Sequence, residues 1–518
     1  MTKTLFKKGL AVATALIMVL VGMASSLPNA FASPGHTLTI NDPDEDSTRQ
    51  YEVYQIFSGE ITGTASNVKL TVSGWGDGVT DAGKTALGDA AAFADTLKDS
   101  KDANALAGRL VKNGYLQNAK TAVWDAATKT YKVENLDSGY YLVKEVDGSL
   151  AGKDKAYTAY IMDIVGNVTV DPKRSTPKFE KKVHDVNESE DIQADKIYWK
   201  DSADHHIGSK VEFSLKADID MPAKEYERYS SYKVVMHDTL SKGLTPPTID
   251  PKNFIFKIND TVMTPEQKEK FTITGAGQQI DISCEDIKAA PLNIKAGDKI
   301  YVIYEATLNE NAVIGSKGNP NELYGEYSNN PNGEGTGTSP KDIVKVFTYQ
   351  VTFNKVNKQG AALKGAEFKL EKKINGQYQD VSERLITTVT ADTVKFEFRG
   401  LDDGIYKLTE TKTPEGCKTM DPAEFRVVAT HDTESDDPQL LTLEGEVMNP
   451  SMLFEGALKF KKDTGSAAAG IVTGDVTNLK KGELPRTGDV GTALIYALGV
   501  ALLASGATLY IRRRKHSA

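Results

Sequence analysis

The stretch LDDGIYKLTETKTPEG, residues 401–416, is the part of the sequence that says most about the fold. Its beginning, Leu401 to Tyr406 followed by Glu410, recurs as Leu136 to Tyr141 followed by Glu145. Leu, Asp, Gly, Tyr and Glu match in the two copies without a gap. Such an internal repeat predicts that the surrounding regions are variants of one β-sandwich.

Short strand-like runs, separated by Gly, Pro, Asn and Asp turns, continue on both sides of the repeat. Apolar and polar residues alternate over 36–40, 210–215 and 366–370, which predicts half-buried strands. Residues 299–304 are apolar almost throughout and predict a strand buried on both faces. The segment 81–113 is rich in Ala, Leu and Lys and predicts one or two helices. The expected class is therefore all-β, with some helix near the N-terminal end.

The chain of 518 residues has an acidic interior between two basic ends. The net charge is −9, and each end (1–32 and 488–518) carries +3, which leaves −15 for the stretch between them. So acidic a body is a poor partner for nucleic acid or anionic lipid. Only two cysteines, Cys284 and Cys417, are present, so neither a disulfide framework nor a cysteine-based metal site is available.

Two links divide the interior into three predicted domains, as its length suggests: a short polar one bracketed by prolines and a longer one rich in Gly, Asn, Pro and Thr. Pro172 and Pro177 bracket a short polar link, and residues 329–340 form a second one. We expect the following segments: a signal peptide at 1–32, domains at 33–176, 177–345 and 346–483, and a C-terminal signal at 484–518.

The two ends predict export and anchoring. Three lysines, the apolar run 9–23 and Ala30-Phe31-Ala32 are typical of a cleaved secretory signal. At the other end an apolar segment, 490–511, is long enough to span a bilayer as a helix, and the basic run 512–515 would hold its end in the cytoplasm. A five-residue motif precedes that segment: Leu484, Pro485, Arg486, Thr487 and Gly488.

This order of motif, span and basic tail resembles the LPxTG cell-wall sorting signal of Gram-positive surface proteins. A plain membrane anchor would leave the pentapeptide unexplained. The resemblance implies that a sortase cysteine attacks the Thr487 carbonyl and cleaves the Thr487–Gly488 bond. The chain would then be the substrate of a transpeptidase and not an enzyme.

Residues 406–416 resemble the E-box of Gram-positive pilins and collagen-adhesin B-type domains. The resemblance implies an isopeptide bond between Lys355 on the first strand and Asn478 on the last, with Glu410 as catalyst and Asn449 as the spare asparagine. The chemistry needs a neutral lysine amine, which burial favours, and a protonated carboxyl that can pass protons on.

The predicted middle domain carries a parallel set. Lys181 shares strand parity with Phe179 and Val183, and the segment 237–244 resembles the strand that bears a catalytic Asp in these domains. We expect a Lys181–Asn329 bond with Asp238 as catalyst, and Lys182 and Asn330 are adjacent rivals.

The predicted first domain departs from this pattern. It has Glu145, but no lysine in 36–40, so no cross-link of this type is expected there.

Residues 167–173 resemble the pilin motif of shaft pilins, in which a lysine after proline is the nucleophile of polymerisation. Lys173 takes that position, although Asp171 and Arg174 depart from the usual Tyr and Asn. Lys178 is the second candidate. The resemblance implies that Lys173 of one subunit attacks the acyl-enzyme formed at Thr487 of another.

Over nearly its whole length the chain resembles a sortase-assembled backbone pilin of a Gram-positive bacterium. The resemblance implies a secreted, cell-wall-anchored shaft subunit, and a singly anchored adhesin is the alternative. The implied partners are pilin-specific and housekeeping sortases, further copies of the chain, minor pilins and peptidoglycan. The sequence does not identify a host ligand. We expect no cofactor and no metal, since no cysteine or third histidine lies near His205-His206.

Overall fold

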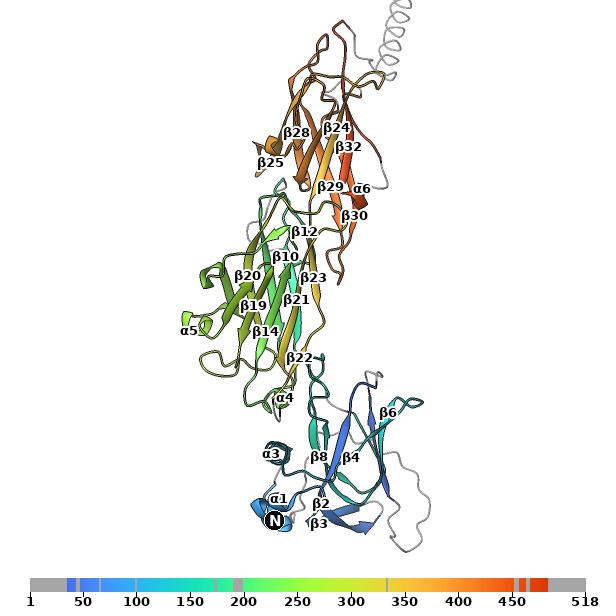
Figure 1. Cartoon of the computed structure of the whole chain (residues 1–518), viewed down its shortest axis with the longest axis vertical. Helices are drawn as coiled ribbons and strands as arrows, with labels where there is room; N and C mark the ends of the chain where they lie inside the picture. Colours follow the sequence, from blue (N-terminus) through green and yellow to red (C-terminus); the bar gives the residue numbers. More distant parts are fainter. Residues whose placement is uncertain are drawn as a thin grey trace, which may run out of the picture.

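The computed structural model describes residues 35–42, 47–64, 67–97, 100–171, 175–189, 199–331, 334–450, 456–462 and 466–482. Within these ranges the strands form six sheets, which pair into three two-sheet units (Figure 1). We call them the first (35–171), middle (175–347) and third (348–482) units. Figure 1 shows them end to end in chain order, from blue to red. The predicted all-β class is confirmed.

Several predicted features lie outside the described residues. These are the signal peptide at 1–32, Lys173, and the sorting signal with its apolar segment at 484–518. In the part that the structure describes, no helix is long and apolar enough to cross a membrane.

The first unit pairs a sheet of order β5-β6-β1-β9 with a sheet of order β3-β2-β7-β8, on which β4 pairs with β2. Helices cover part of it, and they fall in the predicted helical segment 81–113. The elements are β1 (His36–Asn41), β2 (Tyr51–Thr64), β3 (Asn67–Trp75), α1 (Asp81–Leu87), α2 (Ala90–Ala94), α3 (Ser100–Lys112), β4 (Lys120–Thr121), β5 (Val123–Asp125), β6 (Thr130–Leu136), β7 (Gly139–Glu145), β8 (Ala159–Ile164) and β9 (Val168–Val170).

The third unit repeats the inner strand order of the first and differs at the edges of its sheets. Its sheets run β27-β24-β32-β31 and β26-β25-β28-β29-β30, and its first strand, β24, pairs in parallel with its last, β32, as β1 does with β9. The elements are β24 (Tyr349–Asn357), β25 (Glu367–Ile374), β26 (Gln377–Asp380), η2 (Ser382–Arg384), β27 (Lys395–Leu401), β28 (Gly404–Lys412), β29 (Ala423–His431), β30 (Leu440–Val447), β31 (Leu458–Phe460), α6 (Ser466–Ala469) and β32 (Ile471–Asn478).

The sequence repeat has a physical cause in these two units. It forms the turn that leads into β7 in the first unit and into β28 in the third. The Tyr141 hydroxyl donates to the Asp137 carbonyl at 2.8 Å, and the Tyr406 hydroxyl donates to the Asp402 carbonyl at 2.9 Å. Each tyrosine thus fastens its ring to the turn, which positions the glutamate four residues further along the strand.

The middle unit is a larger sandwich with a different strand order. One sheet runs β11-β10-β13-β20-β16-β17 with β15 on β20, and the other runs β12-β23-β21-β14-β19-β18 with β22 on β21. The elements are β10 (Lys178–His184), β11 (Trp199–Lys200), β12 (Ser202–Asp204), β13 (Lys210–Asp218), α4 (Ala223–Tyr226), β14 (Val234–Leu240), β15 (Leu244–Thr245), η1 (Pro251–Asn253), β16 (Phe254–Ile258), β17 (Thr261–Val262), α5 (Pro265–Lys268), β18 (Thr272–Ala276), β19 (Gln279–Cys284), β20 (Lys299–Leu308), β21 (Asn319–Ser328), β22 (Thr336–Thr338) and β23 (Asp342–Phe347).

Buried side chains form one core between the two sheets of each unit, and the first unit has a second core where its helices pack on a sheet. The junction of the middle and third units is an exception: Phe347 ends β23 of the middle unit, but its ring belongs to the core of the third. Backbone hydrogen bonds also cross both junctions, from Tyr157 to Asn329 at 2.7 Å and from Asp201 to Thr433 at 2.9 Å. The units are therefore packed against each other and not merely strung together.

Candidate functional site

The third unit brings the three predicted residues of its site together. Lys355 points into the core from β24, and both it and Glu410 of β28 have fully buried side chains. The Lys355 Nζ lies 3.5 Å from Glu410 Oε1. The Asn478 amide, at the end of β32, donates to Glu410 Oε2 at 2.9 Å. A lysine, a carboxyl and an asparagine amide thus share one buried site between the two sheets.

Register explains why these residues meet. In the parallel pairing of β24 with β32, Lys355 lies opposite Val476 and Asn357 opposite Asn478. Lys355 Nζ also donates to the Val476 carbonyl at 3.2 Å. Glu410 comes from the facing sheet and closes the site from the other side.

The polar contacts leave two reactive atoms without a hydrogen-bond donor or acceptor. Glu410 Oε2 accepts from Met420 N at 3.0 Å and from the Thr413 hydroxyl at 3.1 Å, besides the Asn478 amide. Asn478 Oδ1 is buried and has no hydrogen-bond partner, and the buried Glu410 Oε1 has only the Lys355 amine beside it, at 3.5 Å. Orphaned buried oxygens of this kind are rare in folded proteins and call for an explanation, such as a reactive arrangement.

The site also lowers the basicity of the lysine. Burial lowers the pKa of Lys355 from 10.5 to about 8, although the nearby Glu410 opposes the shift. An ammonium in an apolar site is disfavoured because it has lost its water. A substantial fraction of the amine is therefore neutral near pH 8, the form that can attack a carbonyl carbon.

This shift predicts a pH-dependent stability in an Asn478→Ala chain, which lacks the amide that Lys355 could attack. Between pH 8 and 10.5 the unfolded chain holds a proton on Lys355 that the folded chain has lost. Its unfolding free energy should therefore rise across that range, by about 3 kcal/mol in total. Denaturant unfolding at a series of pH values measures it, with Asn478→Ala/Lys355→Met as the reference. Parallel pH profiles for the two chains would contradict the buried amine.

In the middle unit the structure brings Lys181 and Asp238 together. Lys181 Nζ lies 2.5 Å from Asp238 Oδ1, and neither side chain is exposed. The amine also lies over the rings of Phe213 and Tyr304, 5.2 and 5.5 Å from their centroids. Burial lowers the pKa of Lys181, and Asp238 opposes this shift. The rival Lys182 faces away and pairs with Asp201 at 2.6 Å.

The predicted partner Asn329 is not at this site, which corrects the Lys181–Asn329 assignment. Asp238 of β14 lies opposite Leu323 of β21, and Asn329 is six residues further along, about 20 Å away at the rise of a strand. The Asn329 amide donates instead to the carbonyls of Leu150 and Lys155 in the first unit. The rival Asn330 is one residue beyond it and is no nearer.

A different asparagine, Asn321, lies near Lys181 and Asp238, at the position that the bond-forming amide requires. It is on β21 two residues before Leu323, so it shares the face of Leu323 and lies diagonally across from Asp238. Its amide donates to the Tyr304 hydroxyl at 2.8 Å, and that hydroxyl donates to Asp238 Oδ2. Asn321 is fully buried, and its Oδ1 has no hydrogen-bond partner, as with Asn478.

The sequence contains only part of the signal for Asn321. Asn321, Leu323, Tyr327 and Asn329 share strand parity, and the structure buries all four. Parity alone cannot choose between the two asparagines. The choice depends on the register of β14 on β21, which is set by contacts far apart in the chain.

In the first unit Glu145 faces an arginine and not a lysine. Arg49 Nη1 lies 2.5 Å from Glu145 Oε1, with both side chains fully buried. Glu145 Oε2 accepts from the Thr158 backbone and hydroxyl. A guanidinium stays charged at any physiological pH, so it cannot attack an amide as a neutral amine. The site keeps the carboxylate of the repeat without the lysine that the chemistry needs.

The remaining predicted residues are of two kinds. Lys173, Thr487 and the rest of the sorting motif lie outside the described residues. The spare asparagine, Asn449, binds the backbone of Glu424 and Pro422 at the surface and does not reach Glu410. Lys178 is exposed and pairs with Asp220 at 2.6 Å.

Comparisons with known proteins agree with this architecture. Residues 349–438 match the family described as the prealbumin-like fold domain, and residues 477–517 match the LPXTG cell wall anchor motif. The trypsin-resistant surface T6 protein of Streptococcus pyogenes serotype M6 is 26% identical over 369 residues, which cover 60% of this chain and 65% of that relative. The aligned part is thus just under two thirds of the relative's length.

One solved structure extends the likeness in fold to most of the chain. The T6 backbone pilin of Streptococcus pyogenes serotype M6 aligns with 88% of this chain and 100% of its own, at 18% identity and a TM-score of 0.51. The full-length major pilin SpaD from Corynebacterium diphtheriae aligns with 88% of this chain and 99% of its own, at 18% identity and a TM-score of 0.47. The predicted resemblance to LPxTG-anchored major pilins is confirmed, and the anchor motif indicates a cell-wall surface location.

Proposed function

We propose that the chain is the structural shaft subunit of a covalent surface pilus. A sortase would join Lys173 of one subunit to Thr487 of the next and finally anchor the polymer to peptidoglycan. The observation that carries this proposal is the end-to-end order of the three units (Figure 1). Lys173 falls in the link between the first and middle units, and Thr487 follows β32 of the third. In sequence, the middle and third units therefore separate the two reacting groups, as a head-to-tail fibre requires.

The sortase chemistry is a transpeptidation with a balanced exchange of bonds. The enzyme's cysteine would take the Thr487 acyl group and release the segment that begins at Gly488. The neutral Nζ of Lys173 would then attack the thioester carbonyl, form an amide and return the thiol. The chain supplies both substrate groups and none of the catalytic ones, so it is not an enzyme in this scheme. Minor pilins and a housekeeping sortase complete the expected set of partners.

Two internal cross-links would brace the subunit. In the third unit, the neutral Nζ of Lys355 attacks the Asn478 side-chain carbonyl while Glu410 protonates its oxygen. The lysine's protons pass through Glu410 to the leaving nitrogen, so a C–N bond forms, another breaks and ammonia leaves. The burial of all three groups and the contacts between them support this assignment. The fixed geometry supplies much of the rate.

The second cross-link would join Lys181 to Asn321, with Asp238 as the proton carrier. The 2.5 Å contact of Lys181 with Asp238 supports it, as does the chain of hydrogen bonds from Asn321 through Tyr304 to Asp238. One bond would join β10 to β21 in the middle unit, and the other would join β24 to β32 in the third. Pulling force along the fibre would then pass through covalent bonds.

The wild-type polymer tests the proposed function. Cell-wall extracts boiled in SDS should give a ladder of high-mass species on an immunoblot, because amide bonds survive this treatment. A single species near the subunit mass would contradict the shaft and favour the alternative, a singly anchored adhesin with the same Thr487 chemistry.

A further inference from the structure

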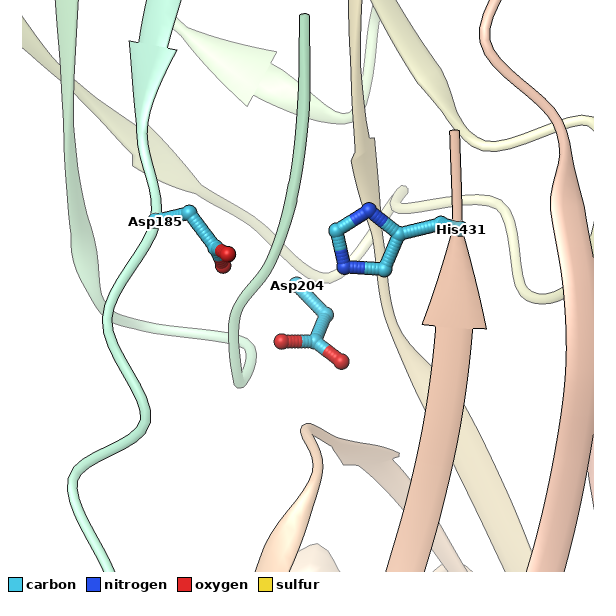
Figure 2. Close-up of side chains that lie close together, drawn as sticks. All are labelled: Asp185, Asp204 and His431. Atoms are coloured by element: carbon cyan, nitrogen blue, oxygen red, sulfur yellow. The ribbon is translucent and has the colours of Figure 1, made fainter. Parts of the chain in front are cut away.

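A cluster of potential metal ligands lies at the junction of the middle and third units. Asp185 follows β10, Asp204 ends β12, and His431 ends β29 of the third unit. One ligand atom from each lies within 4.8 Å of the other two. Figure 2 shows the three side chains converging, with one ring nitrogen of His431 turned toward the carboxylates. None of these residues takes part in the cross-linking chemistry.

The hydrogen bonds around His431 show which ring nitrogen carries the hydrogen and which one faces the carboxylates. The Ser202 hydroxyl has one hydrogen, which it donates to the Asp432 carbonyl, an acceptor only. At its 2.6 Å contact with His431 Nδ1, Ser202 must therefore accept, so Nδ1 carries the ring hydrogen. In the neutral ring Nε2 then presents a lone pair, and it is the nitrogen that faces the carboxylates (Figure 2). A ligating histidine is commonly fixed in this way through its other nitrogen.

Asp204 supplies a second open ligand atom. Its side chain is buried, with only 4% of the residue exposed. Oδ2 accepts from the Tyr349 hydroxyl at 2.9 Å, whereas Oδ1 receives no hydrogen bond from the residues that the structure describes. Oδ1 is therefore an open carboxylate oxygen on a side chain that packing and the Tyr349 hydroxyl hold in place, and a cation could bind it. Asp185 keeps one oxygen on Lys200, at 2.7 Å, and has the other available.

In a neighbouring cluster of the same residue types, a lysine of the chain already neutralises the carboxylates. Glu188, His206 and Asp402 also gather near this junction. There the Lys372 ammonium already lies between the carboxylates, 2.8 Å from Glu188 and 2.6 Å from Asp402. Lys372 thus bridges both carboxylates of that cluster, whereas Lys200 contacts only Asp185 in the first. It therefore serves as a matched comparison for the first.

We propose that Asp185, Asp204 and His431 bind one zinc ion that ties the middle unit to the third. One imidazole nitrogen and two carboxylate oxygens form a donor set that suits zinc, with water in the fourth position. Calcium and magnesium favour sites built from oxygen alone. Tetrahedral zinc ligands lie about 3.4 Å apart, so binding draws the half-buried Asp185 carboxylate inward. The ion would add a further link to the hydrogen bonds, ion pairs and packing that already hold the middle unit against the third.

The test is a calorimetric titration of the full chain, purified in detergent and stripped with EDTA, with zinc chloride alone. The wild type should bind, and Asp185→Asn and His431→Ala should each lose one equivalent or weaken it at least about 100-fold. His206→Ala, in the neighbouring cluster, should leave that equivalent unchanged. Asp185→Asn retains an acceptor for Lys200 and is not expected to unfold the junction. Binding that is absent in the wild type, or equal in all variants, overturns the proposal.

Discussion

Replacing Lys173 by alanine should abolish the high-mass ladder of cell-wall extracts and leave only monomer. An amide between subunits needs a nucleophilic amine, and alanine supplies none, so the expected loss of polymer is complete rather than partial. Asp171, two residues before Lys173, is exposed and accepts from Asn41 at 2.6 Å, which places the start of this link at the surface of the first unit. The chain therefore enters the link from a surface position that a large acyl-enzyme can approach.

Lys178→Ala is the matched control for this result. Lys178 is exposed, but Asp220 holds its ammonium at 2.6 Å and raises its pKa. An amine kept protonated in an ion pair is a poor nucleophile. The ladder should therefore survive in Lys178→Ala. The opposite outcome, a ladder that survives Lys173→Ala and collapses in Lys178→Ala, would move the polymerisation site to Lys178.

Replacing Glu410 by glutamine should strongly destabilise the third unit. Glutamine keeps the shape of the side chain but cannot pass protons, so the Lys355–Asn478 bond should not form. That bond closes a loop of well over a hundred residues, and by analogy with a disulfide its loss costs about 5 kcal/mol. The melting temperature of this unit should fall by roughly 15–20 °C.

Calorimetry and limited trypsin digestion measure this effect. Glu367→Gln is the control, because Glu367 lies on the neighbouring β25 with an exposed side chain and an ion pair to Lys412. That variant should melt within a few degrees of the wild type, since exposed ion pairs contribute little. Equal melting temperatures for Glu410→Gln and the wild type would show that no covalent bond braces this unit.

Much of the third unit could be predicted from sequence because its signals are local. The repeat turn fixes Tyr406 and Glu410 on one strand, and strand parity places Lys355 inside. Asn478 follows because the last strand must close the sheet beside the first. Each of these inferences depends on residues only a few positions apart or on the two ends of a domain.

The rest required the three-dimensional register. Asn321 and Asn329 have the same parity, and only the pairing of β14 with β21 brings Asn321 diagonally opposite Asp238. Likewise Arg49 takes the place of a lysine beside Glu145. It lies before β2, whereas the sequence pattern places the reactive lysine on the first strand, β1. The residues Asp185, Asp204 and His431 come from two units, so no residue spacing within the sequence predicts their cluster.

The two internal cross-links are tested most directly by the intact mass of the purified chain from residue 33 to 487, followed by peptide mapping. We expect a mass lower than calculated by two ammonia molecules, with Lys355 linked to Asn478 and Lys181 linked to Asn321. Glu410→Gln and Asp238→Asn should each restore one ammonia, and Asn329→Ala should restore none. The full calculated mass would contradict both cross-links, and a Lys181–Asn329 peptide would contradict the assignment of Asn321.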